Sequence, residues 1–256
     1  MLRKSLILFG WSLCLSSNLA AQYVQVGEGG FSGSNAGGPM NSTTLSNAWC
    51  KYAYIWPQSL LGNLKHGDTI RSVEFYKDVS TAMQASPSLA IWMGMADSAG
   101  FPGVPISFSA ETAVTGMVKV YDRSPLSDVS GPEGWKKFAF HLAPFVVDTN
   151  LGQHLKVLVA YNQTGAQTAN IPWWYDNRFS LPGLAIGQTR FQTGTGTPQD
   201  TMRNASDVHP SIILNYPRSN RDLLVMKLYT LGKLPVPQPS RRQRPPLRRG
   251  PPPICQ

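Results

Sequence analysis

The stretch SLAIWMGM, at residues 88–95, decides the fold class of this chain. Its large apolar side chains recur at every second position from Leu89 to Met95. This is the period of a β-strand, whose successive side chains point to opposite faces of a sheet. The stretch LKVLVAY, at residues 155–161, repeats the pattern. One apolar face and one mixed face are typical of strands in an antiparallel sheet that has one side on a core.

The same alternation continues on both sides of these two stretches. It predicts further strands at residues 71–77, 114–121, 136–142, 211–216 and 223–231. Glycine- and proline-rich segments separate them and predict turns at residues 100–103, 130–134 and 193–198. Many short strands joined by such turns favour an all-β fold, an antiparallel β-sandwich with a jelly-roll-like arrangement.

The first 21 residues have the order of a secretory signal peptide. Arg3 and Lys4 precede an apolar run at residues 5–15, and the small-residue stretch SSNLAA suits cleavage before Gln22. The run is shorter than the about 20 apolar residues that span a bilayer. We therefore expect a secreted or cell-surface protein with no transmembrane segment in the mature chain.

The positive charge of the chain is concentrated at its two ends. The formal net charge is +9, but two basic residues lie in the signal peptide and five arginines lie in the last 16 residues. The body between them is close to neutral, which argues against nucleic-acid binding, since that function needs a clustered basic face. Residues 240–256 (SRRQRPPLRRGPPPICQ) are predicted to be a disordered basic, proline-rich tail. This tail is either a basic arm or the product of a truncation or frameshift.

Several motifs occur in an order that resembles a known module. They are TIRSVEFYK (69–77), LAIWMG (89–94), GWKKFAF (134–140), APF (143–145), LKVLVAY (155–161), RN (203–204) and HPSIIL (209–214). Together they resemble a β-sandwich module of large secreted and cell-surface proteins of Bacteroidetes-type bacteria. The resemblance covers residues 22–217, with His209-Pro210 in place of the more usual Arg-Pro, and it brings no catalytic residues.

The resemblance also implies a place in a larger protein. Such modules often continue into immunoglobulin-like or fibronectin-like modules and end in a type IX sorting domain, which this sequence does not contain. Residues 218–239 are predicted to be a linker or the start of a following module, because LYTLGK at 228–233 resembles such a start.

One aromatic cluster is a candidate ligand-binding site. It consists of Trp173, Trp174, Tyr175 and Asp176. Flat rings stack on the apolar faces of sugars, and a carboxylate accepts hydrogen bonds from hydroxyls. In a strand Trp173 and Tyr175 would share one face and Trp174 and Asp176 the other, so at least one tryptophan belongs to the core. Packing and the binding of a polysaccharide or surface protein both remain open for this cluster.

Other chemistry has weaker support in the sequence. The histidines, His66, His141, His154 and His209, have no metal-ligand spacing, so no metal site or cofactor is predicted. Asp200 and Asp207 lie in a polar loop that has only a faint calcium signature. Cys50 is expected to be a buried thiol, and Cys255 lies in the tail.

No G-x-S-x-G motif or local Cys-His pattern marks a nucleophile. The leading hypothesis is therefore an exported, non-catalytic binding or spacer module. The alternative is a secreted hydrolase whose catalytic residues are distant in sequence, or an accessory fragment of one.

Overall fold

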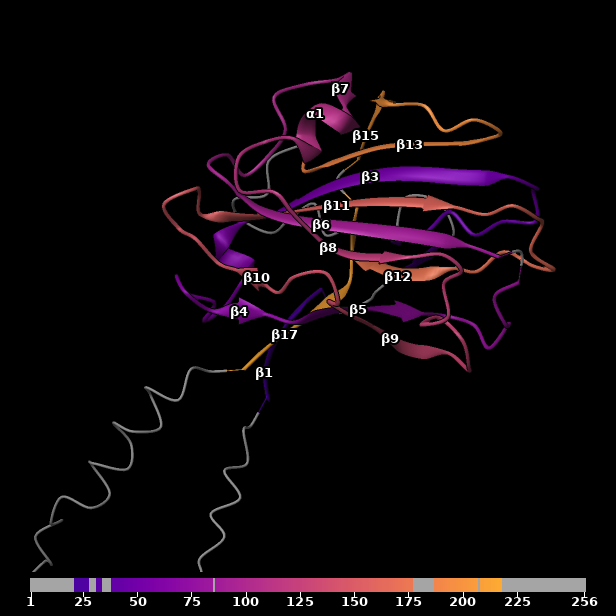
Figure 1. Cartoon of the computed structure of the whole chain (residues 1–256), viewed down its shortest axis with the longest axis horizontal. Helices are drawn as coiled ribbons and strands as arrows, with labels where there is room; N and C mark the ends of the chain where they lie inside the picture. The colour runs from indigo at the N-terminus through magenta and orange to yellow at the C-terminus, as the bar shows by residue number, and fades with distance from the viewer. Residues whose placement is uncertain are drawn as a thin grey trace, which may run out of the picture. The chain divides into compact units, whose positions relative to one another are not determined.

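Antiparallel strand pairing accounts for most of the regular structure of the protein (Figure 1). The computed structural model describes residues 21–27, 31–33, 38–84, 86–176, 187–206 and 208–217. The chain divides into two compact units, Met1–Arg218 and Ser219–Gln256, and the described residues all belong to the first. The predicted signal peptide, except for Ala21, and the predictions for residues 218–256 lie outside the described residues.

The predicted all-β, antiparallel fold class is confirmed. The strands are β1 (Ala21–Val26), β2 (Phe31–Gly33), β3 (Ala48–Trp56), β4 (Thr69–Ile70), β5 (Ser72–Lys77), β6 (Ser88–Ala96), β7 (Ile106–Ser107), β8 (Val118–Arg123), β9 (Gly134–Ala139), β10 (Phe145–Val146), β11 (His154–Asn162), β12 (Trp173–Asp176), β13 (Thr189–Thr195), β14 (Thr201–Met202), β15 (Asn204–Ser206), β16 (His209–Pro210) and β17 (Ile212–Pro217). The helices are the short 3-10 helix η1 (Gln58–Leu60) and α1 (Phe108–Thr112). Within the described residues, no helix has the length and apolar character needed to cross a membrane.

Two large sheets contain most of these strands. One is seven-stranded, in the order β1-β17-β5-β12-β16, with β2 beside β12. Strands β17 and β12 pair with successive parts of one edge of β5, and β9 pairs with the opposite edge. The second is six-stranded, in the order β15-β13-β3-β11-β6-β8. In the six-stranded sheet Val157 of β11 lies between Tyr54 of β3 and Met93 of β6. The pairs β10-β4 and β14-β7 form two small sheets.

One apolar cluster contains side chains from both large sheets. The six-stranded sheet contributes Tyr52, Tyr54, Trp56, Leu89, Ile91, Met93, Val157 and Val159, and the seven-stranded sheet contributes Val73, Phe75, Phe138, Trp173, Ile212 and Leu214. Tyr121 of β8 meets Phe138 of β9 edge-on, with 5.5 Å between ring centroids. Each large side chain removed from water stabilises the fold by about 1.5–3 kcal/mol. The two sheets therefore share one hydrophobic core.

A small cap covers part of the opposite face of the six-stranded sheet. Phe101, Phe108 and Met202, from the segments around β7, α1 and β14, pack against Ala53 and Leu158. The cap is further attached by an ion pair in which Lys156 Nζ lies 2.7 Å from Glu111 Oε2. Strand β3 is consequently almost wholly buried on both faces. A strand buried on both faces does not alternate, which explains why residues 48–56 were not predicted as a strand.

The loop between β8 and β9 is held by two lysines. The fully buried Lys77 donates from Nζ to the Val129 and Gly131 carbonyls, at 3.3 and 2.9 Å. Lys136 Nζ donates to the Ser130 carbonyl at 2.9 Å. Burial, and secondarily the positive charge of Lys136, lower the pKa of Lys77. Main-chain carbonyls thus take the place of a carboxylate as partners for these ammonium groups.

Three sequence predictions about strand limits need correction. The strand predicted at 136–142 is β9, which spans Gly134–Ala139 and so ends three residues earlier. The strand predicted at 114–121 begins at Val118, because residues 114–117 form a turn in which Met117 N donates to the Val114 carbonyl. The turn predicted at 193–198 begins later, because β13 continues to Thr195 and pairs with β3. A Cβ at Gly194 would lie 2.9 Å from Trp49 Cζ2. Gly194 is therefore needed for close packing on the Trp49 ring.

Candidate functional site: an aromatic row on the seven-stranded sheet

Strand β12 divides the predicted cluster between two faces. Trp173 points into the core and is fully buried. The main chain at Gly38 packs so closely on this side chain that a Cβ there would lie 2.3 Å from Trp173 Cβ. No ligand can reach a ring enclosed in this way, so Trp173 has a packing role, as the alternation of neighbours in a strand allows.

Trp174 lies on the other face of β12 and is half-buried. Its indole stacks on the ring of Tyr76 in β5, with centroids 3.5 Å apart and planes 16° from parallel. The indole Nε1 donates to Asp78 Oδ1 at 2.9 Å. Stacking and the hydrogen bond together fix the orientation of the ring.

Trp135 of β9 extends this arrangement on the far side of β5. It is directly opposite Tyr76 in the β5–β9 register. The two rings meet edge-on, with centroids 5.5 Å apart and planes at 86°. Trp135, Tyr76 and Trp174, all half-buried, thus form a line across three adjacent strands, which we call the aromatic row. Aromatic pairs of this kind contribute about 0.5–1.5 kcal/mol each beyond area burial, so the row is rigid before any ligand binds.

Polar side chains lie beside the aromatic row on the same face. Glu74 precedes Tyr76 by two residues, and its register partner Lys137 follows Trp135 by two residues. Asn215 of β17 donates from Nδ2 to Glu74 Oε1 at 2.8 Å. Rings with hydrogen-bonding groups alongside have the composition of a site for a partly apolar, hydroxyl-rich ligand.

The remaining two predicted residues do not extend the row. Tyr175 points to the same face as Trp173 and stacks on Phe31 of β2, with centroids 5.7 Å apart. Asp176 is half-buried at the end of β12. The sequence did not identify Tyr76 or Trp135 as site residues. Alternation places Tyr76 on an outward face, but the strand order that brings the three rings together has no local sequence signal.

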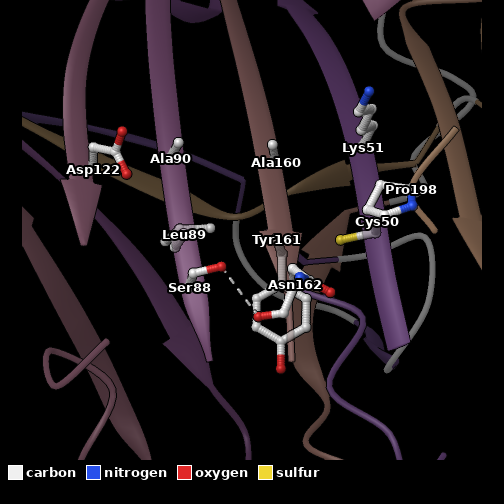
Figure 2. Close-up of a pocket in the computed structure, with 10 residues that line it drawn as sticks. All are labelled: Cys50, Lys51, Ser88, Leu89, Ala90, Asp122, Ala160, Tyr161, Asn162 and Pro198. Atoms are coloured by element: carbon white, nitrogen blue, oxygen red, sulfur yellow. Dashed lines mark hydrogen bonds between the residues drawn. The ribbon is translucent and has the colours of Figure 1, made fainter. Parts of the chain in front are cut away.

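A depression lies on the outer face of the six-stranded sheet, where residues of β8, β6, β11 and β3 line it (Figure 2). Ala90 and Ala160 are opposite each other in the register and form its floor, with Asp122 and Lys51 on the flanking strands. Lys51 pairs with Asp200 at 3.3 Å, and Asp122 pairs with Lys119. Its volume of about 160 Å³ is below the 300–1,000 Å³ of common ligand pockets. We therefore assign no ligand to it.

The acidic residues and histidines of the predictions have other partners. Asp200 accepts hydrogen bonds from Ser107 Oγ at 2.6 Å and from Ser109 N and Oγ at 3.0 and 2.8 Å. The Ser107 bond above all, with the Ser109 bonds and Lys51, lowers the pKa of Asp200 to about 2. These donors occupy the oxygens that calcium would need, and Asp207 lies outside the described residues. In the described ranges no three His, Cys, Asp or Glu side chains group as metal ligands.

Two histidines have polar contacts with neighbouring loops. His66 Nδ1 lies 3.4 Å from Asp148 Oδ1 on the exposed surface, and His154 Nδ1 accepts from Gln58 N at 3.2 Å. Cys50 is a buried free thiol, as expected. Its burial raises the thiol pKa, which keeps it protonated and unreactive.

Comparison with known proteins leaves the family open. No protein-family model and no curated protein matches the chain. One similar structure is a clostridial cysteine protease, Cwp84, after propeptide cleavage, with a TM-score of 0.41 and 9% identity over 78% of this chain and 40% of that one. Another contains the cysteine protease and lectin-like domains of Cwp84, a surface layer associated protein of Clostridium difficile, with a TM-score of 0.36 and 8% identity over 67% and 32%. This chain spans less than half of either matched chain, and similarity at this level supports no assignment.

Proposed function

We propose that this protein is an exported, non-catalytic module that binds polysaccharide through the aromatic row. The observation that carries the proposal is the alignment of Trp135, Tyr76 and Trp174 across three adjacent strands on one face of a sheet. Export is supported by the signal-peptide pattern of residues 1–21. The motif resemblance to a surface module of Bacteroidetes-type bacteria agrees with the same location.

Sugar binding suits this row for two physical reasons. The C–H groups of a sugar pack on the ring surfaces that the stacking of Trp174 on Tyr76 leaves uncovered, while its hydroxyls need hydrogen-bond partners such as Glu74 and Lys137 nearby. A rigid row also loses little conformational entropy when a ligand binds, because stacking and the Asp78 bond already hold the rings. A series of rings along one face matches a polymer better than a single small molecule.

The first test is a glycan-array screen of the mature chain from Gln22, followed by calorimetry with the best ligand. Trp135→Ala and Trp174→Ala should each weaken binding at least tenfold, about 1.4 kcal/mol. Tyr23→Ala is the matched control, since Tyr23 is a 63% exposed ring on β1 of the same sheet, outside the row. It should leave the affinity unchanged.

The outcomes separate binding from a purely structural role. Circular dichroism and thermal melting of each variant show whether the fold is retained. Trp174→Ala removes a stacked ring and a hydrogen bond, so Trp135→Ala is the safer variant if the former unfolds. The proposal fails if no glycan binds, or if folded Trp135→Ala binds as tightly as the unaltered chain.

A further inference from the structure

A cavity that the aromatic row does not use lies at the end of the six-stranded sheet where β3 begins and β13 ends. We propose that this cavity binds one neutral sugar unit, as a second and independent glycan site of the module. Its volume is about 600 Å³, within the range of known ligand pockets. The polar side chains that line it are Asn41, Thr43, Thr44, Asn170, Thr193 and Thr195.

The chemistry of the lining favours a neutral, hydroxyl-rich ligand. None of the lining residues is charged. Within the described part of the chain, the side-chain hydroxyls of Thr44, Thr193 and Thr195 make no hydrogen bond. Each such hydroxyl can both donate and accept, as sugar hydroxyls do. Leu45, which is 59% exposed at the wall, supplies an apolar surface for sugar C–H groups.

Asn41 adds a buried acceptor to this wall. Asn41 as a whole is 7% exposed, and its Oδ1 has no hydrogen-bond donor among the described residues. A buried acceptor without a donor destabilises a structure. The terminal amide torsion is soft, so a small turn of the amide would let a bound hydroxyl supply that donor. The free protein thus has an unmet hydrogen bond on the cavity wall.

The cavity is preorganised by its surrounding loops. Buried Gln163 donates from Nε2 to the carbonyls of Thr43 and Leu45, at 2.9 and 2.7 Å. Asn170 Oδ1 accepts from Thr44 N at 3.2 Å, which leaves the Asn170 amide NH₂ for a ligand. Thr193 and Thr195 are fixed by the pairing of β13 with β3. Walls held in this way lose little freedom on binding.

The absence of charge also predicts which sugars bind. A carboxylate that enters the cavity loses its hydration and meets no cation there. Glucuronic acid should therefore bind at least tenfold more weakly than the corresponding neutral sugar.

The experiment is an NMR titration of the ¹⁵N-labelled mature chain with the methyl glycosides of glucose, galactose, mannose and N-acetylglucosamine. We expect saturable shifts at the amides of Thr44, Thr193 and Thr195 with at least one of them. The double variant Thr193→Val/Thr195→Val keeps the side-chain shape and should weaken that binding at least tenfold. Thr195→Ser alone, which keeps the hydroxyl, should retain most of it, and exposed Thr115→Val is the control.

Each result decides the question, and decides it separately from the aromatic row. Shifts at the cavity that persist in Trp135→Ala support the cavity even if the row binds nothing. The proposal is overturned if none of the four glycosides produces saturable shifts at the cavity, or if the folded double valine variant binds like the unaltered chain. Binding of glucuronic acid as tightly as glucose would also contradict it.

Discussion

At the scale of single residues, Asp200 shows how one side chain can fasten two distant segments. Its carboxylate joins the loop after β13 to Ser107 and Ser109 at the start of α1, about 90 positions earlier in the chain. Ser107 is also the N-cap of this helix, because its hydroxyl accepts from Ala110 N at 3.1 Å. The sequence placed Asp200 in a polar loop with a faint calcium signature. Its partners could not be predicted, since nothing local indicates that residues 107 and 200 meet.

The lowered pKa of Asp200 makes part of the free energy of unfolding depend on pH. The folded carboxyl has a pKa of about 2, against an ordinary value near 3.8. The unfolded chain therefore binds this proton first, so the contribution is present above about pH 4 and is lost as the pH falls toward 2. Urea unfolding should show Asp200→Asn less stable than the unaltered protein at pH 5. The two proteins should converge at pH 2, and an undiminished gap there would contradict this account.

At the scale of secondary structure elements, strands that border water on one face could be predicted and those buried on both faces could not. Strands β6 and β11 were located from the alternation of residues 88–95 and 155–161. The sequence pattern does not predict strand β3, because the cap covers the outer face of this strand and that face therefore lacks the usual polar positions. The sequence pattern does not predict the end of β13, because the two glycines in TGTGTP (193–198) are typical of a turn. In the structure one of them, Gly194, lies inside the strand under a tryptophan ring.

This interpretation of Gly194 has a direct test. Gly194→Ala would place a Cβ 2.9 Å from Trp49 Cζ2 and should destabilise the protein by about 1–3 kcal/mol, measured by urea unfolding. Gly103→Ala is the matched control, because no atom lies within 4 Å of its Cβ position. It should be neutral or slightly stabilising, by up to about 1 kcal/mol. Equal effects of the two substitutions would argue against close packing at Gly194.

At the scale of the whole molecule, the fold class was predictable but the candidate sites were only partly so. Trp174 was in the predicted cluster, whereas Tyr76 and Trp135 join it through the pairing of β5 with β9 and β12. The cavity is lined by three segments, around Thr43, Asn170 and Thr193, which are far apart in the sequence and adjacent in the folded protein. Such groupings follow from strand order, which a single sequence does not encode locally.

The shared core also determines how the molecule responds to alkali. Burial is the first cause that raises the pKa of four core tyrosines, namely Tyr52, Tyr54, Tyr121 and Tyr161. Above about pH 10 the unfolded chain releases these protons while the folded chain retains them, so stability falls as the pH rises. Each tyrosine adds up to about 1.4 kcal/mol per pH unit to this fall.

Removing one of these hydroxyls gives the corresponding measurement. Tyr52→Phe should make the loss of stability above pH 10 shallower by up to about 1.4 kcal/mol per pH unit. Urea unfolding at pH 9, 10 and 11 provides the slope, and absorbance at 295 nm reports tyrosine ionisation in the same samples. A slope identical to that of the unaltered protein would mean that Tyr52 titrates normally in the folded state.

The two lysines of the β8–β9 loop have a practical consequence for measuring local opening. An acylating reagent can reach the enclosed Lys77 amine only when its bonds to the Val129 and Gly131 carbonyls break. Lys137, three positions from the β9 start and exposed, remains reactive throughout. The ratio of acylation at Lys77 to that at Lys137, read by mass spectrometry, therefore counts the fraction of time that this loop is detached. The native chain thus contains an internal reference residue for measuring how often the β8–β9 loop opens.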